Sequence, residues 1–179
     1  MLPGEAQPAS SSTQGRGGHL PAQVRLRPMS DDEYRSWYDW VVDDYAAGHA
    51  ATGNITKEAA RAMADKEFRQ LLPAGVGSLA QHLYTVADAA SGAAVGVIWF
   101  AERTDGGVPH AFIYNIVVWE SHRGKGYGSA AMLAIEPEVR ALGLSRIALH
   151  VFGSNASAIH VYERTGYSAT NILMAKELA

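Results

Sequence analysis

Three glycines stand at alternate positions in the segment Arg123-Gly124-Lys125-Gly126-Tyr127-Gly128. Glycine lets the backbone approach an anion closely, and a helix beginning at Tyr127 would offer N–H groups without internal partners. The helix dipole adds partial positive charge at that end, and Arg123 and Lys125 add full charges. The segment therefore predicts a cradle for a diphosphate over residues 123–129. A plain glycine-rich turn is the alternative interpretation, but the spacing fits neither a P-loop nor a G-x-G-x-x-G dinucleotide motif.

Two polar residues nearer the C-terminus, Asn155 and Tyr162, lie seven positions apart. Two helical turns separate them, so they are expected on one face of a short helix. A phenol with a pKa near ~10 is suited to donating a proton to a leaving group. The alternatives are a packed aromatic ring for Tyr162 and a helix cap for Asn155.

A residue that could act as a general base, removing a proton from an attacking nucleophile, is less sharply defined. Glu120 is the first candidate, because it follows an apolar strand, and a solvated surface charge is its alternative. Three strand residues are alternatives that could hold a water in a cleft: Tyr114, Asn115 and Glu102. His150 could act as a base, or it could pack in the core.

Alternating and helical periodicities place these residues in the order β-α-α-β-β-β-α-β-α-β. Antiparallel hairpins followed by a βαβ unit predict an α/β fold with a mixed, mostly antiparallel sheet of six to seven strands and helices on both faces. Pro137 is expected to kink or divide the third helix. The expected strands are 23–29, 82–87, 94–102, 110–119, 146–152 and 167–178, and the expected helices are about 31–45, 57–72, 127–142 and 155–165.

The composition predicts one globular domain over residues 22–179, after a disordered tail over residues 1–21. The chain has 179 residues, of which 47% are hydrophobic, and a net charge of −3. This charge gives no reason to expect nucleic-acid binding, and no apolar run is long enough for a membrane span. The absence of cysteine excludes disulfides and a thiol nucleophile, and the seven histidines lack a metal-ligand spacing. Without the apolar core of a secretory signal, the cytoplasm is the expected compartment.

Two motifs together resemble those of the GNAT superfamily of N-acyltransferases. The segment 123–128 fits the signature R/Q-x-x-G-x-G/A and follows a Val-rich strand at the usual spacing. The segment from Asn155 to Tyr167 is similar to N-x-x-A-x-x-x-Y-E-x-x-G-[FY]. The resemblance covers about residues 22–178, and the two motifs occur in the family's order.

The resemblance implies direct transfer of an acetyl group from acetyl-CoA to a primary amine, with no metal. In such enzymes the fourth and fifth strands splay apart, often with a bulge in the fourth, and the pantetheine arm lies in the gap. Tyr162 occupies the position of the proton donor to the leaving thiolate. The implied coenzyme contacts are Ile116, Val117, Val118, Arg123, Gly124, Lys125, Gly126, Tyr127, Gly128, Ser129, Asn155 and Tyr162.

The acceptor amine is not identified by the sequence. Most aromatic residues of the first helix are expected in the core, but one or two could line an acceptor cleft. The last segment has room for one strand, so the site could be open to a peptide end or closed by the second subunit of a homodimer. A non-catalytic acyl-CoA sensor and a nucleotide-binding α/β protein are the alternative functions. The aromatic residues concerned are Trp37, Tyr38, Trp40 and Tyr45, together with Trp99 and Trp119.

Overall fold

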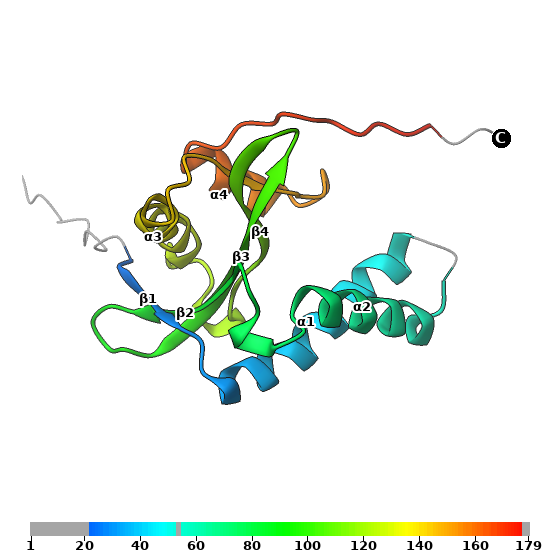
Figure 1. Cartoon of the computed structure of the whole chain (residues 1–179), viewed down its shortest axis with the longest axis horizontal. Helices are drawn as coiled ribbons and strands as arrows, with labels where there is room; N and C mark the ends of the chain where they lie inside the picture. The colour runs from blue at the N-terminus through cyan, green and yellow to red at the C-terminus, as the bar shows by residue number, and fades with distance from the viewer. Residues whose placement is uncertain (1–21, 53–54, 177–179) are drawn as a thin grey trace, which may run out of the picture.

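The computed structural model describes residues 22–52 and 55–176, and within them five strands form one sheet (Figure 1). The sheet order is β1-β2-β3-β4-β5; the first four strands pair antiparallel, and β5 is parallel to β4. The predicted mixed sheet is confirmed, whereas the predicted number of six to seven strands is wrong. The strands are β1 (Val24–Pro28), β2 (Gln81–Asp88), β3 (Ala94–Asp105), β4 (Val108–Val118) and β5 (Ile147–Leu149).

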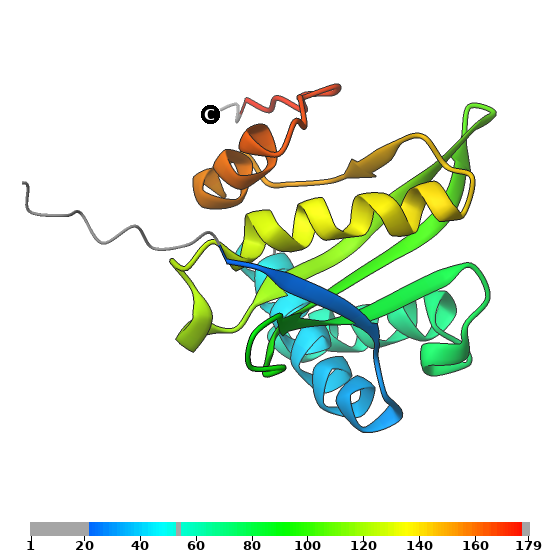
Figure 2. The ribbon, with the colours of Figure 1, turned by 90° about the vertical axis from the view of Figure 1, so that its left-hand side faces the viewer.

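Helices cover both faces of the sheet, as expected. One face packs against α1 and α2 around a core that contains Trp37, Phe68 and Trp99. The other packs against α3 around Phe100 and Met132, with α4 beside α3 (Figures 1 and 2). The helices are α1 (Asp31–Thr52), α2 (Lys57–Leu71), α3 (Tyr127–Ala141) and α4 (Ala156–Arg164), with short 3-10 turns η1 (Gly75–Gly77) and η2 (Glu120–His122).

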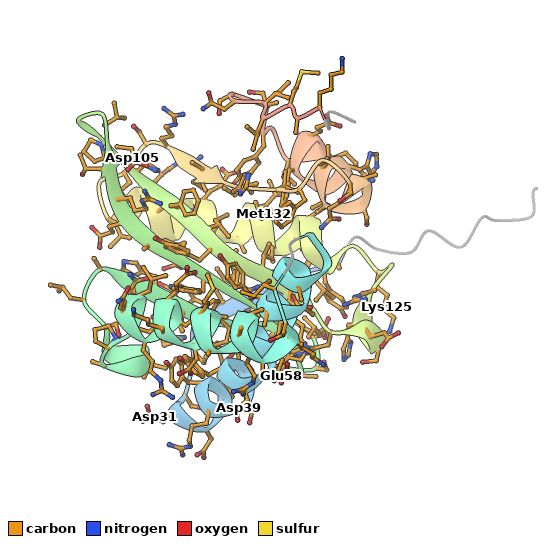
Figure 3. The ribbon with its side chains drawn as sticks, turned by 90° about the vertical axis from the view of Figure 1, so that its right-hand side faces the viewer. Asp31, Asp39, Glu58, Asp105, Lys125 and Met132 are labelled. Atoms are coloured by element: carbon orange, nitrogen blue, oxygen red, sulfur yellow. The ribbon has the colours of Figure 1, made fainter. Side chains whose placement is uncertain are left out.

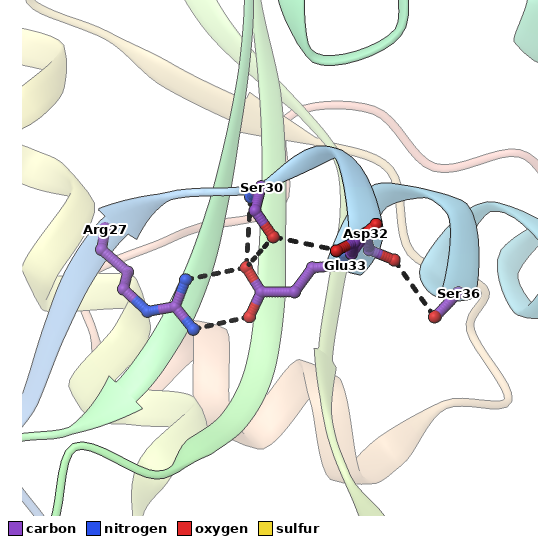
Figure 4. Close-up of polar contacts among 5 residues, drawn as sticks. All are labelled: Arg27, Ser30, Asp32, Glu33 and Ser36. Atoms are coloured by element: carbon purple, nitrogen blue, oxygen red, sulfur yellow. Dashed lines mark hydrogen bonds and ion pairs between the residues drawn. The ribbon is translucent and has the colours of Figure 1, made fainter.

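A reciprocal cap between Ser30 and Glu33 fixes the start of α1, as is typical of a serine followed three residues later by a glutamate. The Glu33 N–H donates to the Ser30 hydroxyl at 3.3 Å, and the Ser30 N–H donates to the Glu33 carboxylate at 3.1 Å. Arg27 on β1 donates two further hydrogen bonds to the same carboxylate, at 2.7 and 2.5 Å (Figure 4). These bonds, led by those from Arg27, lower the pKa of Glu33 to about 2.

Pro137 does not divide α3, which runs as one helix over Tyr127–Ala141. Proline removes the hydrogen bond that its N–H would donate to the carbonyl four residues earlier. That carbonyl belongs to Leu133, whose residue is 53% exposed, so water can replace the missing donor. The helix therefore continues through the proline on its solvent side.

The predicted strand over 167–178 is wrong for the residues that the structure describes. Residues 167–176, here called the C-terminal arm, form neither helix nor strand. The predicted strand over 146–152 is also shorter, because β5 contains only Ile147–Leu149. Strands exist through their pairing partners, and within the described chain β5 has a partner on one side alone.

Candidate active site

A gap opens between β4 and β5 because the two strands pair over three residues only. Ala111–Ile113 of β4 pair with Ile147–Leu149 of β5. Beyond them Trp99 pairs with Asn115 while Phe100 pairs with Ile113, so Tyr114 is an extra residue in β4. Such a bulge bends its strand and increases the local twist. The second half of β4 therefore has no strand beside it on the β5 side.

The backbone of Ile116 faces this gap. The Trp119 N–H donates to the Val95 carbonyl at 2.9 Å, and antiparallel residues alternate between bonding toward and away from a neighbour. The alternation directs Val117 toward β3 and leaves Ile116 and Val118 directed toward the gap. Of the three predicted contact residues, Ile116 and Val118 thus present backbone groups there. The Val117 carbonyl instead abuts Gly96, where an added Cβ would lie 2.1 Å from its oxygen.

The start of α3 offers unpaired amides at the surface. Gly126 is its N-cap, with φ of 88°, and Gly124 has φ of 73°. These values lie in the left-handed region that favours glycine. Within the described residues the helix has no side-chain cap, and its first backbone bond runs from the Ala130 N–H to the Gly126 carbonyl at 3.1 Å. The amides of residues 127–129 therefore have no acceptor in the described part of the chain, as an anion site at a helix start requires.

Two cations brace the loop that precedes α3. The Arg123 Nε donates to the Val118 carbonyl at 3.1 Å, and the Lys125 Nζ donates to the Ser121 carbonyl at 3.0 Å. Both residues are exposed, and Lys125 projects from the loop in Figure 3. The two side chains therefore hold the loop in shape and place positive charge beside the free amides.

The Tyr127 side chain anchors the helix start to the sheet. Its hydroxyl donates to the Asp88 carboxylate at the end of β2, at 2.8 Å. Bonds from the Ser91 amide and hydroxyl, and then from Tyr127, lower the pKa of Asp88 to about 2. The motif drew attention to Tyr127 but gave no sign of Asp88, because their contact spans 39 positions of sequence. Only the backbone of Tyr127 remains available to a diphosphate.

Helix α4 carries the second predicted group. The Asn155 Oδ1 accepts a hydrogen bond from the Ala158 N–H at 3.1 Å, so Asn155 is the cap of α4. A Cβ added at Gly128 would lie 3.8 Å from Val161, which places α4 beside the start of α3. Tyr162 is half-buried, and burial raises the pKa of its phenol. It lines a cavity of about 970 Å³ together with β5 and the C-terminal arm.

The candidate bases are distributed over different parts of the molecule. Glu120 is exposed in η2, and its carboxylate makes no hydrogen bond or ion pair within the described residues. Glu102 forms an ion pair with His82 at 3.0 Å, and on the sheet it is the residue of β3 that pairs with Ala111 of β4. His150 is exposed just after β5, so its expected place in the core is wrong. None of these residues is held in an orientation toward Tyr162 by a bond within the described chain.

The bulge residues face α1. The Asn115 Oδ1 accepts a hydrogen bond from the Trp37 indole N–H at 3.2 Å. Tyr114 stacks on Trp99 with ring centroids 4.6 Å apart. Neither contact was predicted, although Asn115 and Tyr114 had been singled out as cleft residues. The bulge explains why both face the same side of the sheet.

The expectation that most of the four aromatic residues of α1 pack in the core is only half right, because Trp37 is buried and Tyr38 is half-buried against the core, whereas Trp40 and Tyr45 are exposed. Trp37 and Trp99 are 2% and 1% exposed, and the Tyr38 hydroxyl donates to Asp65 at 3.1 Å. Trp40 is 37% exposed and meets Trp119 edge to face at 5.6 Å. These two indoles line a separate hollow of about 460 Å³.

Two kinds of site are not found in the part of the chain that the structure describes. It contains no group of three or more histidine, aspartate or glutamate residues that could hold a metal ion. None of the helices there has the length and apolar character to cross a membrane.

Comparison with known proteins gives consistent matches over most of the chain. A family model described as the acetyltransferase (GNAT) family matches residues 13–167. YycN of Bacillus subtilis, an uncharacterized N-acetyltransferase, is 32% identical over 155 residues, which are 87% of this chain and 99% of YycN. A mycothiol acetyltransferase of Propionibacterium freudenreichii is 31% identical over 160 residues, which are 88% of this chain and 47% of that protein.

Solved structures show the same architecture. The crystal structure of YycN superposes with a TM-score of 0.79 at 31% identity and covers 88% of this chain and 99% of that one. An acetyltransferase from Pyrococcus furiosus superposes with a TM-score of 0.67 at 23% identity, covering 87% of this chain and 100% of that one, and supports the fold alone.

Proposed function

This chain belongs to the GNAT family of acetyltransferases, and from that premise we propose that it transfers an acetyl group from acetyl-CoA to a primary amine. One observation carries the proposal. The free amides at the start of α3 lie beside the half of β4 that lacks a strand neighbour. An anion site next to an open strand edge suits a ligand that has a diphosphate followed by an extended amide-bearing arm.

The residues divide between the two parts of such a ligand. The amides of residues 127–129 would hold the diphosphate, within the positive field of Arg123 and Lys125. The backbone N–H and carbonyl of Ile116 would pair with the arm as a neighbouring strand does. The Asn155 amide nitrogen, which the helix cap does not use, can donate to the same arm.

Tyr162 would act in the last step of the transfer, when the sulfur leaves. The thioester supplies the acetyl group, and the amine nitrogen forms a bond to its carbonyl carbon as the carbon–sulfur bond breaks. Tyr162 donates its phenolic proton to the departing sulfur, and solvent restores that proton. Its raised pKa keeps the phenol protonated at neutral pH, which a proton donor requires.

The amine must lose its own proton before it attacks. Glu120 is the predicted acceptor of that proton, but a base works only from a fixed geometry, and the described residues give its carboxylate no orienting contact. A water held by Asn115 is the alternative, because the Trp37 bond fixes the Asn115 amide on the α1 side of the bulge. Comparing kcat of Glu120→Gln and Asn115→Ala separates the two routes.

This missing base favours a second candidate function, a domain of the same fold that binds acyl-CoA without turnover. Both candidates require acetyl-CoA binding, and only the enzyme releases thiol at a rate that depends on the amine.

The decisive experiment is an acceptor screen in which free thiol release from acetyl-CoA is measured. The panel would contain an aminoglycoside, a polyamine, free amino acids and peptides with a free N-terminus. We expect release to rise with one amine class and to saturate. Calorimetric binding of acetyl-CoA without amine-dependent release would support the sensor, and no binding at all would contradict both.

A further inference from the structure

Helix α3 begins without the kind of side-chain cap that fixes the other helices. Its N-cap is Gly126, and no side chain of the described residues accepts a hydrogen bond from its first amides. Side-chain caps are present on the other three helices, through Ser30 at α1, Thr56 at α2 and Asn155 at α4. A cap on α3 would occupy the amides that a coenzyme diphosphate requires. The direction of these amides must therefore be set by a contact made away from them.

The Tyr127 side chain makes such a contact, with a turn that is distant in the sequence. Tyr127 is the first residue of α3, and its hydroxyl donates to the Asp88 Oδ2 at 2.8 Å. Its ring packs against the core on the α3 face of the sheet. The hydrogen bond therefore ties the first turn of α3 to the end of β2 through the side chain, and it leaves the backbone amides uncovered.

Asp88 is itself held on several sides and can serve as an anchor. Its Oδ1 accepts hydrogen bonds from the Ser91 amide at 2.8 Å and from the Ser91 hydroxyl at 2.7 Å. Its backbone N–H donates to the Ala93 carbonyl, and its carbonyl accepts from the Gly92 N–H, both at 2.9 Å. The turn uses one carboxylate oxygen and Tyr127 uses the other, so the two sets of bonds do not compete.

We propose that Asp88 and the Tyr127 phenol are positioning residues, whose hydrogen bond takes the place of a helix cap and sets the direction of the amides that bind the coenzyme diphosphate. Neither side chain touches the coenzyme, because Tyr127 acts through its own backbone and Asp88 acts through Tyr127. The inference rests on the proposed function in naming the diphosphate as the ligand of these amides. It extends the coenzyme site to the turn between β2 and β3, which lies outside both sequence motifs.

Variants at the two positions test the role of the bond. Tyr127→Phe and Asp88→Ala each remove it, so each should raise the Kd for acetyl-CoA about fivefold. The double variant should raise the Kd no further, since both changes remove the same bond. Asp88→Asn should keep the wild-type Kd, because its amide oxygen can accept from Ser91 while its amide nitrogen donates to the phenolic oxygen.

Ser91→Ala is the matched control within the turn. It removes the hydroxyl that donates to the Asp88 Oδ1, and it leaves the bonds from the Ser91 amide and from Tyr127 in place. Its Kd for acetyl-CoA should equal that of the wild type. A rise as large as that of Tyr127→Phe would assign the effect to the turn and would contradict the proposal.

Fragments of the coenzyme give a readout that a loss of stability alone would not move. Inorganic pyrophosphate carries the diphosphate alone, and S-acetylpantetheine carries the thioester arm without it. By NMR titration, Tyr127→Phe should raise the Kd for pyrophosphate by the same factor as for acetyl-CoA and should leave the Kd for S-acetylpantetheine unchanged. Equal weakening of both fragments would show general damage and would overturn the positioning role.

Hydrogen exchange of the unliganded protein tests the contact without any coenzyme. The Ala130 N–H makes the first backbone bond of α3, so it should exchange faster in Tyr127→Phe than in the wild type, while the amides of α4 exchange at the same rate in both. A wild type that binds no acetyl-CoA would overturn the proposed function. Equal Kd values for the wild type and Tyr127→Phe would overturn the positioning role alone.

Discussion

Tyr162 and Tyr167 offer a matched pair of phenols at the cavity beside β5. Their rings lie 6.0 Å apart, and burial raises the pKa of both. The Tyr167 hydroxyl is buried and has no hydrogen-bond partner in the described chain. Only Tyr162 lies on α4 at the position expected of a proton donor, so the two residues separate chemistry from packing.

We expect Tyr162→Phe to lower kcat about 100-fold, the lower range for loss of a general acid, while the Kd for acetyl-CoA stays unchanged. Tyr167→Phe should keep wild-type kcat, because removing its hydroxyl breaks no bond within the described chain. Thiol release and calorimetry measure the two quantities. Equal activity of both variants would remove Tyr162 from the mechanism.

Gly126 should be required for coenzyme binding, because its φ of 88° aims the first amides of α3. An alanine in the left-handed region costs about 1 kcal/mol, and relief of that strain would turn the amides away. We predict that Gly126→Ala raises the Kd for acetyl-CoA about tenfold. Gly106→Ala is the control, since Gly106 has φ of 58° in the distant β3–β4 turn. It should lose similar stability and keep its Kd.

At this scale the sequence predicted what depends on local spacing. The glycines of the loop, the cap at Ser30 and the cap at Asn155 follow from residue type and near neighbours. The bond between Trp37 and Asn115 joins residues 78 positions apart, and no local pattern encodes it. The assignment of Tyr162 and the coenzyme contacts stays a prediction until a ligand is bound.

At the scale of elements, the closeness of β3 and β4 depends on Gly96. A Cβ at that position would lie 2.1 Å from the Val117 carbonyl oxygen, which is backbone and cannot turn aside. We predict that Gly96→Ala destabilises the protein by more than about 2 kcal/mol, measured by urea unfolding. Gly77→Ala, with no atom within 4 Å of the added Cβ, should change the free energy of unfolding by only a few tenths of the loss expected for Gly96→Ala. Comparable losses in both variants would disprove the role of the contact.

The junction of β1 and α1 should make stability depend on acid. Glu33 has its pKa lowered from 4.5 to about 2, so its contribution is present above pH 4.5 and is lost as the pH falls toward 2. The Arg27–Glu33 pair is partly exposed, and solvent screening limits it to about 1 kcal/mol.

A double-mutant cycle with Arg27→Gln and Glu33→Gln isolates this pair. The coupling in unfolding free energy should be largest near pH 7 and should fall away as the pH drops through 2. A coupling that is as large at pH 2 as at pH 7 would show that the carboxylate charge is not its source.

Strands that have pairing partners in the described sheet were predicted well, and strand-like segments without such partners were not. The hairpin strands β2, β3 and β4 have antiparallel partners joined by short turns, and their predicted ranges agree with the structure to within a few residues. The segments 146–152 and 167–178 have strand-like sequences but lack partners in one copy of the described chain. A propensity for strand is therefore realised only where a neighbouring strand pairs with the segment.

For the molecule as a whole, ligand binding should increase the free energy of unfolding. A ligand at 100 times its Kd adds about 2.7 kcal/mol to the unfolding free energy. For a chain of this size each kilocalorie raises Tm by about 2–4 °C, so saturating acetyl-CoA should raise Tm by about 5–10 °C. ATP and NAD at the same concentration should raise it by less than about 2 °C. An equal shift with all three would indicate a general nucleotide site.

The hydrogen bonds within the loop before α3 have a consequence for the association rate of the coenzyme. Arg123 and Lys125 already bond to carbonyls of their own segment, and Tyr127 already bonds to Asp88. These bonds hold the loop in shape before any ligand binds, so no free energy is lost in ordering the loop on binding. After rapid mixing, we expect one exponential whose rate climbs linearly with coenzyme concentration and shows no plateau from a slow isomerisation.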